Sequence, residues 1–333
     1  VKVFFIAILC ILLTSFLFGQ DETQYAGEFM AIGVGARPLG MGGTFAGLAD
    51  DASTSYWNPA GLVNVKGVEV SSVKLTTKMN ELDTKYTYVN LVYNAGDDVG
   101  SFGVSWLRQA IADIKLTDIS GNIIAENTEN ADNAFYIAYG RYLVKGLSIG
   151  ASLKILLGNY PALVYNSNSL NWEEAQISYN GFGFDIGLFL NAGDLVKELR
   201  GLALGVNVQD IYTTLNWDEV PGIAEATTEQ VEINFKPGIS YTLPIDQFKI
   251  VAAVDVDTKY QLIIHAGGEI WWNDMVAIRG GIKNWGEISV ENLGSLQQES
   301  DWAIGGSIRW YFIGVDYAYV YNELAPTQYL SVI

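Results

Sequence analysis

The sequence predicts an all-β protein: a transmembrane antiparallel β-barrel of roughly 14 strands with an N-terminal hatch or plug segment. Three observations lead to this prediction. Apolar residues alternate with small or polar ones over most of the chain, and short connections alternate with long ones. After the first residues no stretch is apolar for the ~18 residues of a membrane-spanning helix. Half of the 333 residues are hydrophobic and 13% are aromatic, while 17% are charged.

Residues 1–19 have the pattern of a secretory signal peptide. Lys2 supplies a positive start, an apolar run follows from Val3 to Leu13, and cleavage after Gly19 is plausible. The alternative is an uncleaved anchor helix, for which the run is short, because a span needs about 20 residues. We therefore expect export, with cleavage of the signal peptide, to the outer membrane of a Gram-negative bacterium.

Residues 20–64 differ in character, because they are rich in glycine and precede the alternating pattern. Glycine allows close backbone packing and tight bends, so we expect a compact hatch folded inside the barrel mouth. A nucleotide-binding loop at Gly40-Met41-Gly42 is a weak alternative, since no strand precedes it and no βαβ unit follows. The residues expected to form the hatch motif are Gly35, Arg37, Pro38, Gly40, Gly42, Asp51, Asn58, Pro59 and Ala60.

The same segment resembles the N-terminal signature of the PorV/PorQ family. The runs Gly35–Gly43, Ala49–Ser53 and Tyr56–Leu62 carry the resemblance. That family belongs to the FadL-like group of outer-membrane barrels, whose Asn-Pro-Ala element is matched here by residues 58–60. The resemblance implies the architecture predicted above, and no cofactor is expected.

Residues 65–333 are predicted to form one barrel domain with period-2 alternation. Leu153 and Ile155, for example, alternate with Ser152 and Lys154. A soluble sandwich buries such an apolar face, whereas a membrane barrel turns it to lipid and the polar face to the lumen. The predicted strands begin near Val65, Thr84, Val99, Asn133, Leu147, Ile177, Leu202, Val231, Phe248, Gln261, Met275, Asp301, Gly314 and Gln328.

Charged residues on the polar face are expected to fill the lumen as an ion-pair network. The alternative is that they line or flank a transport path. Interior polar residues are usual in such barrels, which favours the network. The residues concerned are Lys154, Asp185, Asp255, Glu269, Arg279, Arg309 and Asp316.

The lengths of the predicted connections depend on whether the preceding strand is odd- or even-numbered. Tight turns such as Lys145-Gly146 follow most even-numbered predicted strands, and the long connections 120–132, 159–176, 211–230 and 286–300 follow odd-numbered ones. Bacterial barrels have short periplasmic turns and longer outside loops, which a soluble sandwich has no reason to imitate. Aromatic residues in these loops are candidate outside contacts, or ordinary cover over the mouth: Tyr160, Tyr165, Trp172 and Trp217.

Several functions are disfavoured by composition. A net charge of −18 argues against nucleic acid, which basic patches bind. Cys10 and His265 are the only residues of their types, so a metal site built on such ligands is nearly excluded. No Gly-x-Ser-x-Gly motif accompanies His265, so we expect no catalytic residues and no enzyme activity.

Two functions compete. The resemblance implies a type IX secretion accessory that binds or shuttles secreted cargo at the outer membrane, with outer-membrane lipid and other secretion components as partners. The alternative is a FadL-like transporter of hydrophobic small molecules. A hydrophobic groove between hatch and wall would favour transport, whereas a closed, ion-paired lumen would favour the shuttle or a structural role.

Overall fold

The computed structural model describes residues 26–79, 82–166, 171–221, 224–259, 262–283, 287–288, 301–322 and 326–333. The predicted signal peptide and its cleavage site lie outside these residues. No helix in these ranges is long and apolar enough to cross a membrane.

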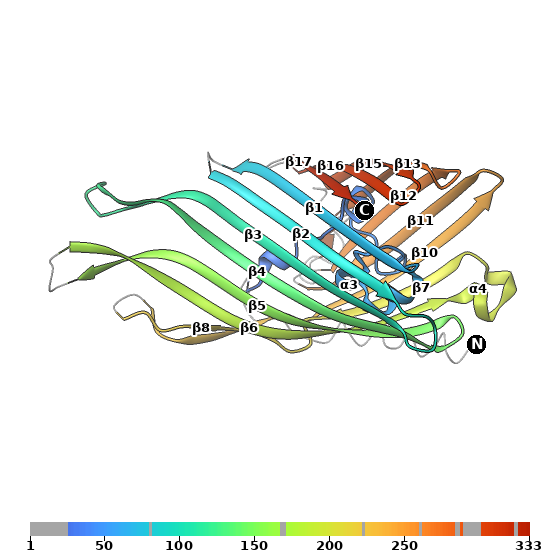
Figure 1. Cartoon of the computed structure of the whole chain (residues 1–333), viewed down its shortest axis with the longest axis horizontal. Helices are drawn as coiled ribbons and strands as arrows, with labels where there is room; N and C mark the ends of the chain where they lie inside the picture. The colour runs from blue at the N-terminus through green and yellow to red at the C-terminus, as the bar shows by residue number, and fades with distance from the viewer. Residues whose placement is uncertain are drawn as a thin grey trace.

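Fourteen strands of the described residues form the wall of a closed antiparallel barrel, as predicted (Figure 1). Each strand pairs with the next along the wall, and β1 closes the barrel by pairing with β17. The wall strands are β1 (Val68–Met79), β2 (Leu82–Asn94), β3 (Ser101–Thr117), β4 (Ile123–Val144), β5 (Leu147–Asn166), β6 (Asn171–Asn191), β7 (Leu202–Gln209), β10 (Asn234–Ile245), β11 (Phe248–Asp257), β12 (Leu262–Trp272), β13 (Val276–Lys283), β15 (Asp301–Trp310), β16 (Ile313–Tyr321) and β17 (Thr327–Val332).

Three shorter strands extend this wall. β8 (Thr213–Trp217) follows β7 after a break and pairs with β6, while β9 (Thr227–Val231) pairs with β8 and leads into β10. β14 (Glu287–Ile288) follows β13 and pairs with β12. The predicted long connection 211–230 is therefore largely a hairpin, and most of 286–300 lies outside the described residues.

Two predicted loops are wrong. The connections expected at 120–132 and 159–176 are mostly strand, because β4 begins at Ile123, β5 continues to Asn166 and β6 begins at Asn171. The β3–β4 and β5–β6 hairpins project beyond the rest of the wall (Figure 1). Their backbones keep pairing, down to Asn166 opposite Asn171. The apolar alternation stops earlier, since strand faces wetted by water on both sides need no apolar face.

The opposite end carries the short connections. There Asn273 and Asp274 both have positive φ, at 50° and 55°, as a two-residue type I′ hairpin requires. The short helices α4 (Ala192–Leu195) and η4 (Lys197–Leu199) join β6 to β7 at this end. We call it the turn end and the other, with the β3–β4, β5–β6 and β8–β9 hairpins, the hairpin end.

The outer surface of the wall is apolar. Along β6, the side chains of Phe182, Phe184, Ile186 and Leu188 are 42–45% exposed, while the residues between them face inward. An apolar band of this extent is unstable in water and matches the lipid-facing surface of membrane barrels. The alternation in the sequence therefore separates lipid from lumen.

The core of the molecule lies inside the barrel, where the hatch occupies part of the lumen (Figure 1). Its short elements are η2 (Glu28–Met30), α2 (Ala36–Gly40), α3 (Thr54–Trp57) and η3 (Pro59–Asn64). Phe45 and Trp57 of the hatch belong to one buried cluster with Tyr86, Leu107 and Leu156 of the wall. The hydrophobic contacts that hold the hatch are thus made with inward-facing wall residues.

Candidate functional site

The hatch is seated on the turn-end half of the wall through its Asn-Pro-Ala element. The side-chain amide of Asn58 donates to the carbonyls of Ala46 (3.0 Å) and Leu188 (3.1 Å), and its oxygen accepts from the amide of Ala60 (3.1 Å). Pro59 begins η3, where its missing N–H costs nothing. One side chain therefore ties two hatch turns to β6.

Inward-facing glycines let the hatch backbone approach the wall. A Cβ atom added at Gly150 would lie 2.3 Å from the carbonyl carbon of Pro59, and one at Gly205 would lie 1.8 Å from the oxygen of Ala46. No side chain fits at those distances. The hatch motif therefore has matching positions in the wall that sequence reasoning did not identify.

Arg37 links the hatch to the barrel charges. Its guanidinium donates to Glu269 (2.6 Å) and Asp50 (2.6 Å), with Asp51 at 3.3 Å. Burial lowers the pKa of the Arg37 guanidinium, but the charges of Asp50 and Glu269 outweigh this and leave it well above its usual value. The ion pairs continue from Glu269 to Arg279, whose guanidinium donates to the Glu269 carboxylate at 3.2 Å. Arg279 also pairs with Asp316, and Asp316 pairs with Arg309 at 2.8 Å.

The remaining predicted lumen residues form two separate groups. Lys154 pairs with Asp185 (2.7 Å) and with Asp210, which also accepts from Lys259 (3.3 Å). Asp255 accepts the backbone amides of Phe45 and Ala46, each at 2.6 Å. The structure thus places the seven predicted residues in three clusters, two of which hold the hatch, rather than in one network.

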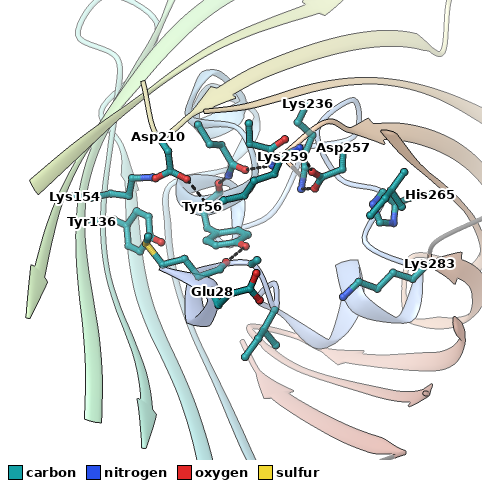
Figure 2. A pocket seen from close by; sticks show the side chains of 16 residues that line it. Glu28, Tyr56, Tyr136, Lys154, Asp210, Lys236, Asp257, Lys259, His265 and Lys283 are labelled. Carbon is teal, nitrogen blue, oxygen red and sulfur yellow. Dashed lines mark hydrogen bonds and ion pairs between the residues drawn. The ribbon is translucent and has the colours of Figure 1, made fainter. Parts of the chain in front are cut away.

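An inner cavity of about 300 Å³ lies beside the hatch and is lined mainly by charged and polar side chains (Figure 2). Lys236 pairs with Asp257 at 2.8 Å, and His265 Nδ1 lies 3.0 Å from the Gly42 carbonyl. The labelled lining residues are Glu28, Tyr56, Tyr136, Lys154, Asp210, Lys236, Asp257, Lys259, His265 and Lys283. Lys236 lies on the same face of its strand as the inward-facing Ser240, and Asp257 on the same face as Asp255. The alternation in the sequence could therefore have identified both as lumen residues.

An outer cavity of about 370 Å³ lies closer to the hairpin end, between η2 and the wall. The hydroxyls of Tyr160 and Tyr179 both donate to Asp132 Oδ1, each at 2.7 Å. The Trp217 ring centroid lies 5.4 Å from that of Tyr160 and 4.8 Å from that of Tyr179. The cavity is lined by Ala26, Gly27, Glu28, Phe29, Gln109, Asp132, Tyr160, Tyr179, Leu215, Trp217 and Glu229.

The structure separates the four aromatic residues predicted as outside-loop contacts. All four lie on strands: Tyr160 and Tyr165 on β5, Trp172 on β6 and Trp217 on β8. Tyr160 and Trp217 line the outer cavity, whereas Tyr165 and Trp172 contact each other edge-on, 5.4 Å apart, near the end of the β5–β6 hairpin. Sequence reasoning missed Tyr179 and Asp132, which complete the cavity.

No group of three or more His, Cys, Asp or Glu side chains in the described ranges could hold a metal ion. The His265 imidazole contacts hatch backbone and lines the inner cavity.

Comparisons with known proteins place the fold among FadL-like outer-membrane barrels. Residues 19–169 match the model of an uncharacterised protein family, UPF0164. No curated protein matches the chain significantly by sequence. Similar solved structures include the toluene transporters TodX of Pseudomonas putida and TbuX of Ralstonia pickettii; each is 14% identical with a TM-score of 0.55, and each alignment covers 90% of this chain and 96% of that one.

A FadL homologue of Pseudomonas aeruginosa is also similar, with 11% identity, a TM-score of 0.54, and coverage of 90% of this chain and 97% of that one. At these identities the likeness is one of fold. It agrees with the FadL-like group implied by the sequence resemblance, while PorV/PorQ membership stays a prediction.

Proposed function

We propose that the protein is an outer-membrane transporter that takes up small, largely apolar molecules, exported to that membrane by a signal peptide at residues 1–19. The observation that carries the proposal is the outer cavity, an aromatic-lined space between hatch and wall near the hairpin end. The transporters of toluene that share the fold support the same function. A transported molecule binds first among Tyr160, Tyr179 and Trp217, and then passes the hatch.

The partition between the two cavities is η2. Glu28 lines both cavities, while Phe29 lines the outer one and Met30 the inner one. The η2 turn is held by the hydroxyl of Tyr56, which donates to the Met30 carbonyl. In this proposal, passage from the outer to the inner cavity requires η2 to move, while the Arg37 and Asn58 contacts keep the rest of the hatch in place.

A reversible lock on η2 tests this function. A Cβ atom at Gly27 would lie 3.2 Å from a methyl group of Val231 on β9, so the double variant Gly27→Cys/Val231→Cys brings two thiols within reach. Gly27 has a φ of 73° and the new Cβ would lie 2.9 Å from the end of the Met30 side chain, so the oxidised and reduced forms of the same variant are compared and share this strain. The sequence's single cysteine, Cys10, lies in the predicted signal peptide, so the engineered pair forms without competition. Uptake of radiolabelled toluene is measured before and after reduction in intact cells that carry the variant in their outer membrane, with cells lacking the protein as the baseline.

We expect the oxidised variant to lose uptake and the reduced variant to recover it. Equal uptake by both forms would show that η2 is not the moving part. Uptake by cells carrying wild type that is no faster than uptake by cells lacking the protein would overturn the transport of toluene itself.

A type IX secretion accessory is the second candidate, favoured by the projecting β3–β4 and β5–β6 hairpins (Figure 1). In this function the hairpins bind secreted cargo, with Tyr165 and Trp172 at the working surface. The test is co-purification of cargo carrying a C-terminal sorting domain with wild type and with Tyr165→Ser/Trp172→Ser. Equal recovery, or no recovery, would remove this candidate.

A further inference from the structure

We infer that the outer cavity selects an organic cation, an amine or quaternary ammonium attached to a small apolar group. The inference rests on the proposed function in taking this cavity as the first docking site of the transported molecule. Three of the lining side chains are carboxylates, namely Glu28, Asp132 and Glu229, and none is basic. A neutral or anionic ligand would leave that negative charge uncompensated.

The aromatic rings supply the second half of a cation site. Tyr160, Tyr179 and Trp217 come from β5, β6 and β8 and converge in one cluster, with ring centroids 4.8–6.3 Å apart. The face of an aromatic ring carries partial negative charge, which attracts a cation while still accepting apolar contact. Quaternary ammonium groups are the ligands that combine these two demands.

The carboxylates of this cavity are left available. The two tyrosine hydroxyls fix Asp132 through Oδ1, and Oδ2 accepts no hydrogen bond from the described residues. Within that part of the chain no salt bridge involves Asp132, Glu229 or Glu28. By contrast, Asp185 and Asp257 deeper in the barrel each contact a lysine within 3 Å.

The surroundings suit a small ligand. A volume of about 370 Å³ is near the lower end of ligand pockets, which span roughly 300–1,000 Å³. Three of the four lysines of the inner cavity, Lys154, Lys236 and Lys259, are paired with Asp185, Asp210 or Asp257. Lys283 forms no salt bridge with the described residues, so the inner cavity opposes an entering cation with one uncompensated positive charge rather than four. A single ammonium group therefore meets its counter-charges in the outer cavity.

The experiment compares three water-soluble molecules of matched shape: choline, its neutral analogue 3,3-dimethylbutan-1-ol, and the anion 3,3-dimethylbutanoate. Binding to the full chain in nanodiscs is measured by calorimetry. We expect choline to bind at least tenfold more tightly than the neutral analogue, a difference of about 1.4 kcal/mol, and the anion to bind least.

Asp132→Asn keeps an acceptor for both tyrosines and removes the charge. It should weaken choline binding about tenfold and leave binding of the neutral analogue unchanged. Asp274→Asn removes the same charge at the turn end and should change neither. Glu229→Gln, on a separate strand, repeats the test if Asp132→Asn fails to show the heat-dependent gel mobility of a folded barrel.

Equal affinities for choline and its neutral analogue, or no binding of any of the three, would overturn the inference. Either result leaves the transport function to be judged by toluene uptake and the cysteine lock. If wild type takes up neither toluene nor choline but still binds choline selectively, the transport function is removed and the cation site is retained.

Discussion

The two halves of the lumen use the same strand pattern for opposite purposes. Toward the turn end, inward positions such as Gly150 and Gly205 carry no side chain, and the hatch backbone occupies the space. Toward the hairpin end, inward positions carry Tyr160, Tyr179 and Asp132, which surround a cavity. The size of the inward residue, rather than the alternation itself, decides whether the hatch backbone packs directly against the wall. We call the region where it does the sealed half, and the region around the outer cavity the open half.

Charge follows the same division. In the sealed half, Glu269 is fully buried and contacts both Arg37 and Arg279, so its desolvation is compensated by ion pairs and hydrogen bonds. In the open half, the carboxylates face a cavity and form no salt bridge with the described residues. The sealed half is built for stability and the open half for a ligand, and substitutions can test each statement.

The largest effect is expected for Glu269→Gln in the sealed half. The change leaves Arg37 and Arg279 buried beside a neutral amide, and breaking a buried ion pair costs about 3–5 kcal/mol. We expect the lower end of that range, because Asp50 and Asp316 still contact the two arginines. Urea unfolding from lipid vesicles measures the free energy. A loss of unfolding free energy below about 1 kcal/mol, the usual value of a surface ion pair, would contradict the statement that the sealed half is stabilised by buried ion pairs.

A smaller loss is expected for Gly205→Ala, which places a methyl group 1.8 Å from the Ala46 oxygen. Overpacking of this kind costs about 1–3 kcal/mol, and here it displaces the hatch. We therefore expect ion conductance in planar bilayers and protease cleavage within residues 26–64. Gly280→Ala is the matched control, since its methyl group meets its nearest neighbour, the Ala303 oxygen, at 3.6 Å. Identical conductance of both variants would show that hatch seating does not seal the lumen.

The lipid-spanning wall could be predicted because lipid and lumen impose different residues on alternate positions. Predicted starts at Leu147, Leu202, Phe248 and Asp301 coincide with the first residues of β5, β7, β11 and β15. The starts predicted at Asn133 and Ile177 are wrong, because the outer parts of β4 and β6 are polar and carry no such alternation. Backbone pairing continues there without a hydrophobic signal.

The candidate site was less accessible to prediction. Inward parity identifies charges on regular strands, such as Lys154 and Glu269, and it could have identified Lys236. Asp210 lies in the break between β7 and β8, where parity is lost. Asp132 and Tyr179 share a hydrogen bond across 47 positions, which no local pattern encodes.

An intermediate effect is expected for Asn58→Ala. The change removes two donated hydrogen bonds and one accepted bond, and it leaves the carbonyls of Ala46 and Leu188 without this donor. Losing a buried hydrogen-bond partner costs about 1–3 kcal/mol. Asn58→Asp is the matched variant: it keeps the acceptor for Ala60 but loses both donors. We expect both variants to raise amide hydrogen exchange in η3. Protection equal to wild type would show that Pro59 alone fixes this turn.

The smallest effect belongs to the open half. Tyr179→Phe removes one of the two hydroxyls that hold Asp132, while Tyr160 still donates to it. The net value of one such hydrogen bond is about 0.5–1.5 kcal/mol, so urea unfolding should change far less than in Glu269→Gln. The same variant frees Asp132 to move and should weaken the binding of choline in the outer cavity. A stability loss as large as that of Glu269→Gln would mean that the aromatic cluster is a structural core, and the division of the lumen into a sealed and an open half would fail.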